Sequence, residues 1–196
     1  MRERKQTEHK RPNTGQIEQE IQRRKRKRSL RRVLSSTVFT LLSVVAVAIL
    51  LATQLFPTLS IYGSSMNPVL EEGEIAVSVK GSTFETGDII AFYYNNKLLV
   101  KRVICGPGDW FNMQEDGTVF VNGVKLEEPY IEELSFGQCD LELPFQVPDE
   151  NYFVMGDQRE SSVDSRMRQL GCVPKEQILG RIVLCVWPLD HIHVIK

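Results

Sequence analysis

An uncharged apolar segment from Val33 to Phe56 constrains the fold of this chain more than any other feature. It reaches the length of roughly 20 residues that a helix needs to cross a bilayer, and it lacks the polar face of a surface helix. A cleaved signal sequence would have an apolar region of only about 7–15 residues before a small-residue cleavage site. Here the segment ends in Gln54-Leu55-Phe56-Pro57, so we predict an uncleaved, single transmembrane helix at residues 33–56.

Charge is distributed unevenly around this anchor. Residues 1–32 contain 13 of the 24 Lys and Arg residues but only 4 of the 25 Asp and Glu residues. Positive charge beside a membrane helix favours the cytoplasm, which predicts a cytoplasmic N-terminus and an extracytoplasmic segment 57–196 at the cell membrane. Residues 16–32 could form a charged helix, but the tail 1–32 has no apolar stripe to bury, so we expect it to be disordered or frayed. A further interpretation of Arg23–Arg28 is a patch for lipid headgroups or nucleic acid; we expect membrane lipid as a partner and no nucleic acid.

Residues 57–196 have the pattern of short β-strands joined by tight turns. Asn122-Gly123 has the residue types of a type I′ hairpin turn, and Asn95-Asn96-Lys97 joins two longer apolar runs. About 140 residues suffice for one core, and we predict a mostly β fold, an antiparallel barrel or sandwich. The expected strands are Glu74–Val79, Asp88–Tyr94, Leu98–Ile104, Thr118–Val121, Val124–Leu126, Tyr152–Met155 and Arg181–Trp187.

A serine on a turn is the first candidate for chemistry. Ser65 follows Gly63 and precedes Pro68, which removes a backbone donor and prevents a helix at this point. A serine nucleophile needs a base. His191 and His193 share a face of the last short strand, where a solvated edge strand is the simplest interpretation, so a Ser-His-Asp triad is the weaker alternative. A metal site there would need a third ligand that the sequence does not reveal.

Lys101 is the better candidate for the base. Strand alternation places it on one face with Leu99, Val103 and Cys105. Such a lysine either extends its amine past the sheet edge into solvent or is desolvated. Desolvation lowers the lysine pKa from about 10.4 toward neutrality, and only the neutral amine accepts the proton of a serine hydroxyl. Arg102 points to the other face and stays protonated, so it is excluded as the base.

Three motifs follow the anchor in order: Ser-Met-x-Pro at 65–68, Lys-Arg-Val-Ile-x-x-Pro-Gly-Asp at 101–109 and Gly-Asp-x-Arg-x-x-Ser-x-Asp-Ser-Arg at 156–166. Together they resemble the bacterial type I signal peptidases. The resemblance implies a monomeric serine endopeptidase that removes signal peptides from exported preproteins through an acyl-enzyme, with no cofactor and no metal. It implies that Ser65 is the nucleophile and Lys101 the general base. It further implies that Ser162 orients the lysine and that Asp164 and Arg166 form a structural ion pair.

The resemblance also implies a substrate preference for small residues one and three positions before the cut. An extended peptide between residues 60–63 and 98–100 would add a strand to the sheet, and its alternate side chains would face one wall. The residues implied for substrate binding are Ile61, Gly63, Met66, Leu70, Leu99 and Val100. Because Gly63 stands where some family members have a serine, the oxyanion would depend mainly on backbone N–H groups, chiefly that of Ser65.

The four cysteines lie in the extracytoplasmic segment, where disulfides are permitted. Cys105 and Cys185 lie in or beside apolar strands, and we expect them to be core residues. Cys139 and Cys172 flank the third motif in irregular regions. We predict that these two form a bridge that closes the loop.

Two other functions fit parts of the sequence. Self-cleaving repressors share the Ser-Lys chemistry, but they would need a DNA-binding domain where this chain has a membrane segment. A membrane-anchored β module that binds partners without catalysis is the second alternative. The presence of both Ser65 and Lys101 argues against it.

Overall fold

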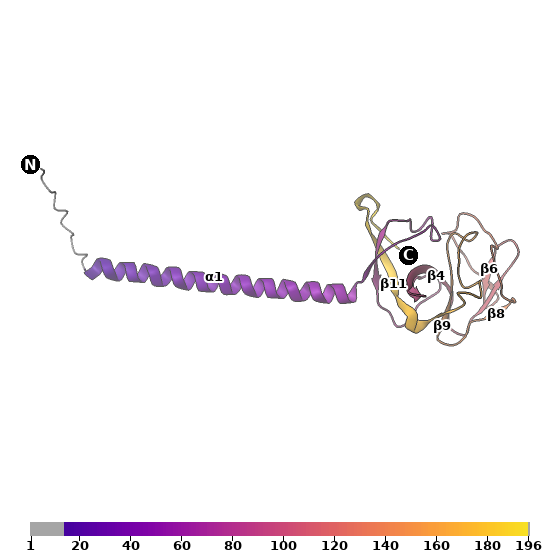
Figure 1. The fold of residues 1–196 in the computed structure, drawn as a ribbon, viewed down its shortest axis with the longest axis horizontal. Helices are drawn as coiled ribbons and strands as arrows, with labels where there is room; N and C mark the ends of the chain where they lie inside the picture. Colours follow the sequence, from indigo (N-terminus) through magenta and orange to yellow (C-terminus); the bar gives the residue numbers. More distant parts are fainter. Residues whose placement is uncertain (1–13, 196) are drawn as a thin grey trace, which may run out of the picture. The chain divides into compact units, whose positions relative to one another are not determined.

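The computed structural model describes residues 14–195. Contacts divide the chain into one unit that ends at Leu51 and a second that begins at Ala52. Most of the helix α1 (Thr14–Leu55) belongs to the first unit (Figure 1). Its segment Gln22–Leu51 is long and apolar enough to cross a membrane. The helix ends two residues before Pro57, because a proline disfavours helical backbone in the residue that precedes it.

The helix begins well before the apolar segment. Residues 14–32 are helical, where we expected a disordered chain, and residues 1–13 of that expected tail lie outside the described residues. Glu, Gln, Lys and Arg are good helix formers, and a helix extends readily once an adjacent part has nucleated. The charged flank therefore continues the helix without contributing an apolar face.

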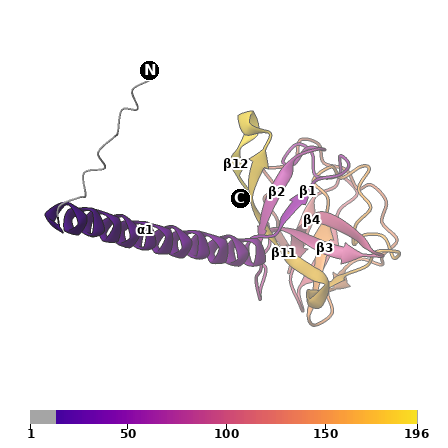
Figure 2. The same cartoon turned by 60° about the vertical axis from the view of Figure 1, so that its left-hand side comes forward.

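The second unit contains two antiparallel sheets (Figures 1 and 2). The larger has the strand order β1-β2-β11-β3-β4-β9-β10, with β12 paired to β11, and the smaller has the order β7-β6-β5-β8. Neither closes into a barrel among the described strands, so the fold is sandwich-like. The larger sheet comprises β1 (Thr58–Ser60), β2 (Ile75–Val79), β3 (Ile89–Tyr94), β4 (Lys97–Cys105), β9 (Asn151–Met155), β10 (Val173–Pro174), β11 (Ile178–Trp187) and β12 (His193–Val194). The smaller comprises β5 (Trp110–Met113), β6 (Val119–Val121), β7 (Val124–Lys125) and β8 (Phe145–Gln146).

Two hairpins form at the predicted asparagine turns. Asn95 and Asn96 connect β3 to β4 with φ of 46° and 59°, and Asn122 and Gly123 connect β6 to β7 with φ of 52° and 79°. Positive φ at both central residues defines the type I′ turn, whose twist matches that of paired strands. Two short 3₁₀ helices, η1 (Lys175–Gln177) and η2 (Leu189–His191), flank β11.

The core consists of three apolar clusters. Ile89 and Ala91 of β3 belong to one cluster while Ile90 and Phe92 belong to another, because successive strand side chains point to opposite faces. The third cluster joins the two sheets: Phe111 of β5 stacks on Phe153 of β9 with ring centroids 4.1 Å apart. Strand β4, between β3 and β9, is therefore buried along its second half, and this strand carries Lys101.

Candidate active site

Ser65 lies in the loop between β1 and β2, on a turn held by its own backbone. The Asn67 N–H donates to the Ser64 carbonyl at 3.1 Å, and the Leu70 N–H donates to the Met66 carbonyl at 2.9 Å. The Met66 side chain is buried in the core and anchors the turn. Ser65 itself is half-buried, so this anchored turn presents its hydroxyl at the surface of the protein.

The structure brings Lys101 and Ser65 together. Lys101 is only 4% exposed, and its Nζ donates a hydrogen bond of 2.6 Å to Ser65 Oγ. Burial lowers the Lys101 pKa from 10.5 to about 8; the negative charges of Asp164 and Asp157 oppose this shift, and the positive charge of Arg166 adds to it. Of the two environments that the sequence allowed for this lysine, the structure has the desolvated one.

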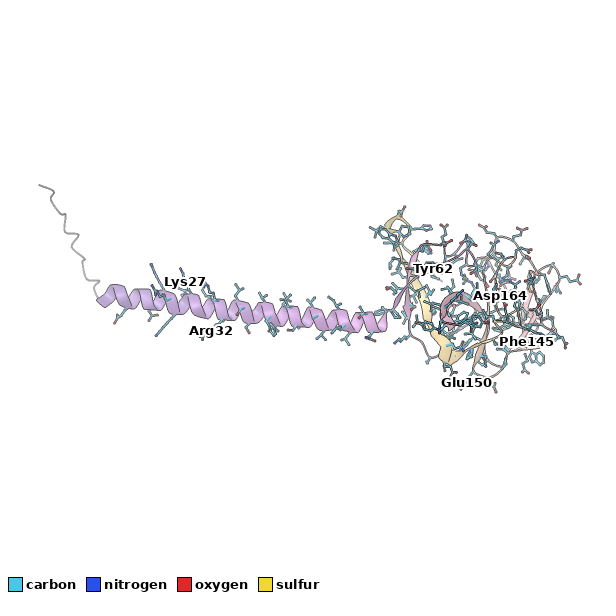
Figure 3. All side chains as sticks on the ribbon, in the orientation of Figure 1. Lys27, Arg32, Tyr62, Phe145, Glu150 and Asp164 are labelled. Carbon is cyan, nitrogen blue, oxygen red and sulfur yellow. The ribbon has the colours of Figure 1, made fainter. Side chains whose placement is uncertain are left out.

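Asp164 and Arg166 form an ion pair beneath this contact. Both side chains are fully buried, and the Arg166 Nε lies 2.9 Å from Asp164 Oδ1. Arg166 also donates to the carbonyls of Phe136 and Arg159, each at 2.7 Å. Asp164, labelled in Figure 3, accepts a further bond of 3.1 Å from the Gly156 N–H. Because every charge is paired, the pair can hold the loop 156–166 in one conformation.

Ser162 is placed differently from the expectation. Its side chain is buried, yet its Oγ has no hydrogen-bond partner among the described residues, so the implied bond to Lys101 is not formed. The Lys101 amine bonds to Ser65 instead. Ser162 packs against Gly156: a Cβ on that glycine would lie 2.2 Å from Ser162 Oγ and 2.6 Å from the Ser65 carbonyl oxygen. Ser162 therefore borders the site through packing.

Five charged or aromatic residues of the site region were missed by sequence reasoning. Arg102 donates twice to Asp157, at 2.8 and 2.7 Å, and its guanidinium carbon lies 3.8 Å from the Tyr130 ring centroid. Arg159 pairs with Glu128. Asp157 and Arg159 belong to the third motif and Arg102 to the second, so their positions in the motifs were the available signal. Glu128 and Tyr130 carried none.

The predicted substrate residues line a narrow groove beside Ser65 and Lys101, with one exception. The groove has a volume of about 40 Å³ and is lined by residues of 59–66 and 98–101, including Ile61, Gly63, Met66, Leu99 and Val100. Leu70 is fully buried in the cluster behind Met66 and does not line the groove, because the turn directs it into the core. Tyr62, an additional lining residue, extends into solvent (Figure 3).

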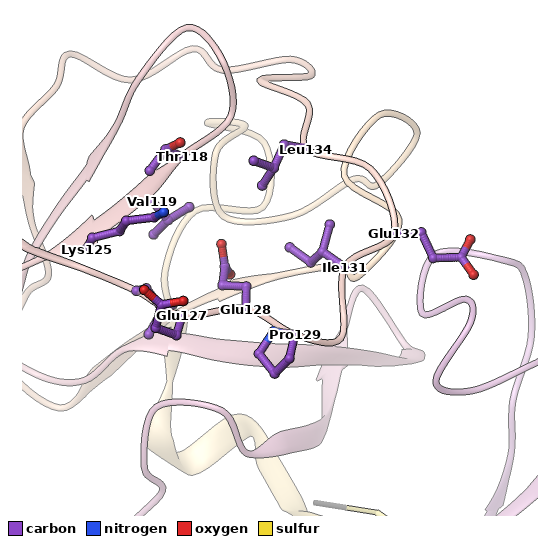
Figure 4. Close-up of a pocket in the computed structure, with 10 residues that line it drawn as sticks. Thr118, Val119, Lys125, Glu127, Glu128, Pro129, Ile131, Glu132 and Leu134 are labelled. Carbon is purple, nitrogen blue, oxygen red and sulfur yellow. The ribbon is translucent and has the colours of Figure 1, made fainter.

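A larger cavity of about 370 Å³ lies elsewhere in the second unit, between β6–β7 and the segment 126–134 (Figure 4). Its polar lining is mostly carboxylates, from Glu127, Glu128 and Glu132. A carboxylate cluster attracts cations, but it does not contain the hydroxyl–amine contact that Ser65 and Lys101 make. The groove beside Ser65 and Lys101, although smaller, is therefore the candidate active site.

The predicted Cys139–Cys172 bridge is absent: all four cysteines are free. Cys172 directly precedes β10, which pairs with β9, so its side chain packs against the cluster that contains Cys105 and Phe153. Burial raises the pKa of the Cys172 thiol to about 11 and that of Cys105 to about 12. The Cys172 sulfur therefore packs in the core and does not bond to Cys139.

Comparison with known proteins agrees with the three motifs. The family model described as signal peptidase, peptidase S26, matches residues 34–187. Signal peptidase I of Bacillus amyloliquefaciens is 36% identical over 163 residues, which cover 78% of this chain and 87% of the relative. Signal peptidase I P of Bacillus subtilis subsp. natto is 38% identical over 160 residues, covering 75% and 85%, and signal peptidase IB of Staphylococcus aureus strain COL is 37% identical over 152 residues, covering 67% and 78%.

A crystal structure of a signal peptidase I from Enterococcus faecalis matches with a TM-score of 0.43 and 30% identity, covering 50% of this chain and 96% of that one. The family model and the curated relatives both extend over most of the chain. The chain belongs to the signal peptidase family, peptidase S26. It is a hydrolase of the serine endopeptidase class, and its activity is the removal of signal peptides.

Proposed function

We propose that this peptidase cuts signal-peptide-bearing preproteins with Ser65 as the nucleophile and Lys101 as the general base. The single observation that carries the proposal is the 2.6 Å hydrogen bond between Lys101 Nζ and Ser65 Oγ. This bond connects the attacking hydroxyl with the lysine amine. Burial lowers the pKa of that amine to about 8. At a pH near 8 a large share of the lysine is neutral and able to accept a proton.

In the proposed reaction, Lys101 takes the hydroxyl proton as Ser65 Oγ attacks the scissile carbonyl. Backbone N–H groups, chiefly that of Ser65, hold the oxyanion, since Gly63 supplies no hydroxyl. The protonated lysine then gives its proton to the leaving amine, and the acyl-enzyme forms. Neutral again, Lys101 deprotonates a water molecule that hydrolyses the ester and frees the enzyme.

The ion pair Asp164–Arg166 acts through position and charge. Its contacts hold Gly156 against the Ser65 backbone, and Gln158 N donates to the Ser65 carbonyl at 3.1 Å. The carboxylate of Asp164 limits how far burial lowers the Lys101 pKa. A pKa that stays near 8 keeps the neutral amine basic enough to accept the serine proton, which it then passes to the leaving amine.

The groove supports a preference for small substrate side chains. A peptide that lies extended between residues 60–63 and 98–100 would present its side chains one and three positions before the cut to the same wall. The groove is narrow, and the buried side chains of Ile61 and Met66 form part of its wall, which favours small substrate side chains at both positions.

We further infer that α1 is the anchor, that residues before it face the cytoplasm, and that residues 57–196 face the other side. The basic residues that precede the apolar segment, among them Arg31 and Arg32, support this orientation and an attraction to anionic lipid. The enzyme would act as a monomer. Protease added to the outside of intact spheroplasts should digest the β unit and leave α1 protected; the reverse pattern contradicts the topology.

The dyad is tested by cleavage of a purified preprotein by the full chain in detergent. Ser65→Ala and Lys101→Ala should each lower the rate by at least roughly 10³-fold, because the two residues act as one unit. Ser64→Ala and Lys97→Ala are matched controls: an exposed serine one position away and an exposed lysine on the same strand, both expected to keep the rate. Full rate in either dyad variant would show that the assignment is wrong.

A further inference from the structure

Three side chains that can bind a metal gather at one end of the larger sheet, outside the active site. Glu74 directly precedes β2, His191 ends η2, and His193 begins β12. One ligand atom from each lies within 4.8 Å of the others. The strand pairing explains the gathering: Cys185 of β11 pairs with Ala76 of β2 on one side and with His193 of β12 on the other (Figure 2).

Glu74 is the ligand that the sequence did not reveal. It is only 3% exposed, although a carboxylate is costly to bury without a compensating charge. Its Oε2 accepts a hydrogen bond of 3.0 Å from the Glu71 N–H, and its Oε1 lies 2.9 Å from His191 Nδ1. One oxygen is therefore fixed by the backbone, and the other is directed at the histidines.

His193 is held in an orientation that leaves its Nε2 for a metal. Its Nδ1 lies 2.9 Å from the carbonyl oxygen of His191. A carbonyl oxygen only accepts hydrogen bonds, so Nδ1 carries a proton and Nε2 is the ring nitrogen left to offer a lone pair to a metal. Metal-binding histidines characteristically donate their other ring N–H to a carbonyl or carboxylate in this way, which fixes the tautomer and the ring orientation.

We propose that Glu74, His191 and His193 bind a divalent transition metal of the zinc type. Two imidazoles and one carboxylate suit Zn²⁺, with water in the fourth position, whereas Mg²⁺ and Ca²⁺ prefer oxygen ligands alone. The three ligand atoms lie within 4.8 Å of one another, whereas atoms bound about 2.0–2.2 Å from one ion lie closer together. The side chains must therefore move slightly toward the ion to bind it. His191, whose side chain is 54% exposed, has the freedom to turn toward the ion.

The metal would fasten the C-terminal segment to the chain that backs the groove. The Ile61 N–H donates to the Glu74 carbonyl at 2.8 Å, and the Gly73 N–H donates to the Ile61 carbonyl at 3.0 Å. Ile61 in turn lines the groove beside Ser65. Bound metal should therefore slow amide exchange in the segment 189–195 and raise the melting temperature of the β unit.

The test uses the full chain in detergent, purified without a histidine tag and stripped with a chelator. Co²⁺ titrated into the protein should give one saturable site per chain with visible absorption, and Zn²⁺ should displace it. Glu74→Gln, His191→Asn and His193→Asn should each weaken Co²⁺ binding by at least about tenfold, as expected for loss of a metal ligand or its partner. His9→Asn removes the third histidine of the chain and Glu72→Gln an exposed neighbouring acid; both controls should bind as the wild type.

The simpler alternative is an ion pair between His191 and Glu74 without any metal. It predicts no saturable Co²⁺ binding, or binding that all three ligand variants retain, and either result overturns the proposal. Melting temperature separates the two further. Zn²⁺ should raise it in the wild type and not in His193→Asn, a variant that leaves the His191–Glu74 contact intact and so keeps the fold. These readouts do not depend on peptidase activity, so a failed dyad assignment would leave this test unaffected.

Discussion

Lys101 donates a hydrogen bond of 2.6 Å to Ser65 although 36 residues separate the two in sequence, and burial rather than an acidic or basic partner dominates its pKa. The main opposing influences are the charges of Asp164 and Asp157, which favour the protonated amine. The pKa of the proposed base therefore depends mainly on how much water the fold excludes from around it. This relationship has consequences for rate and for stability.

The first prediction concerns the pH dependence of cleavage. The neutral amine is the active form, and the Lys101 pKa is about 8, so kcat/KM should rise with pH through about 8 and level off above it. A pH–rate profile with a signal-peptide substrate measures this. A profile that is flat from pH 6 to 9, or that continues to rise as for an ordinary lysine at 10.5, would exclude Lys101 as the base.

The second prediction is that Lys101→Met stabilises the protein at neutral pH while abolishing cleavage. Lowering the pKa from 10.5 to about 8 corresponds to a cost on the order of 3 kcal/mol when the amine is protonated. Loss of the hydrogen bond to Ser65 offsets about 1 kcal/mol, leaving a gain on the order of 2 kcal/mol. Denaturation of the full chain in micelles measures the free energy of unfolding.

The sign of the pH dependence provides the control for this variant. The folded state binds fewer protons at Lys101 than the unfolded state between pH 8 and 10.5, so wild-type stability rises with pH in that window. Lys101→Met lacks this gain. The stability difference between the two proteins should therefore shrink as the pH approaches 10.5; a constant difference would show that packing, not protonation, causes it.

The third prediction concerns Gly156. A methyl group there would lie 2.6 Å from the Ser65 carbonyl oxygen and 2.2 Å from Ser162 Oγ, so Gly156→Ala must displace the nucleophile. We expect at least roughly a 10²-fold loss of kcat/KM, the usual effect of misplacing a reacting group by about 1 Å. Gly106→Ala is the matched control, because its nearest neighbour would be 3.4 Å away.

Adding Ser162→Ala to Gly156→Ala should not restore the rate. The double variant removes the Ser162 hydroxyl, but the contacts with Ser162 Cβ at 2.7 Å and with the Ser65 backbone remain. Recovery of the rate in the double variant would mean that Ser162 alone transmits the strain. Single-turnover cleavage assays distinguish these outcomes.

The fourth prediction compares two ion pairs that differ in burial. Arg166→Gln leaves the fully buried Asp164 carboxylate unpaired and should cost about 3–5 kcal/mol of unfolding free energy. Arg181→Gln breaks the pair with Asp88, whose arginine is 52% exposed, and should cost less than about 1 kcal/mol. Urea denaturation midpoints measure both, and equal effects would contradict the structural role of the buried pair.

Features that depend on neighbouring residues were predictable. The long apolar helix, a candidate for crossing a membrane, follows from hydropathy, and the two hairpins follow from asparagines that adopt positive φ. Signals of this kind are local, because they depend on backbone preference and on the hydropathy of a short segment. The helical residues 14–32 are the exception: their propensity for helix was present, and the absence of an apolar face led us to expect disorder.

Features that depend on contacts between distant residues could not be predicted from the sequence. Glu74 and His191 are 117 residues apart, and nothing near Glu74 in the sequence marks it as a partner of the histidine. The sequence placed Arg102 on the face of the strand opposite Lys101, but only the fold shows that Asp157 and Tyr130 enclose it. Cys172 packs in the core instead of bonding to Cys139, because the pairing of β10 with β9 decides where its sulfur lies.

The sequence by itself therefore determined the long apolar helix, the β character of the rest and, through three motifs, the family and the two residues that we propose as its dyad. Only the tertiary structure decided whether Lys101 extends into solvent or is desolvated against Ser65. The physical reason is that hydropathy and turn preference belong to short segments, whereas a pKa depends on the water and charge that distant strands exclude or supply.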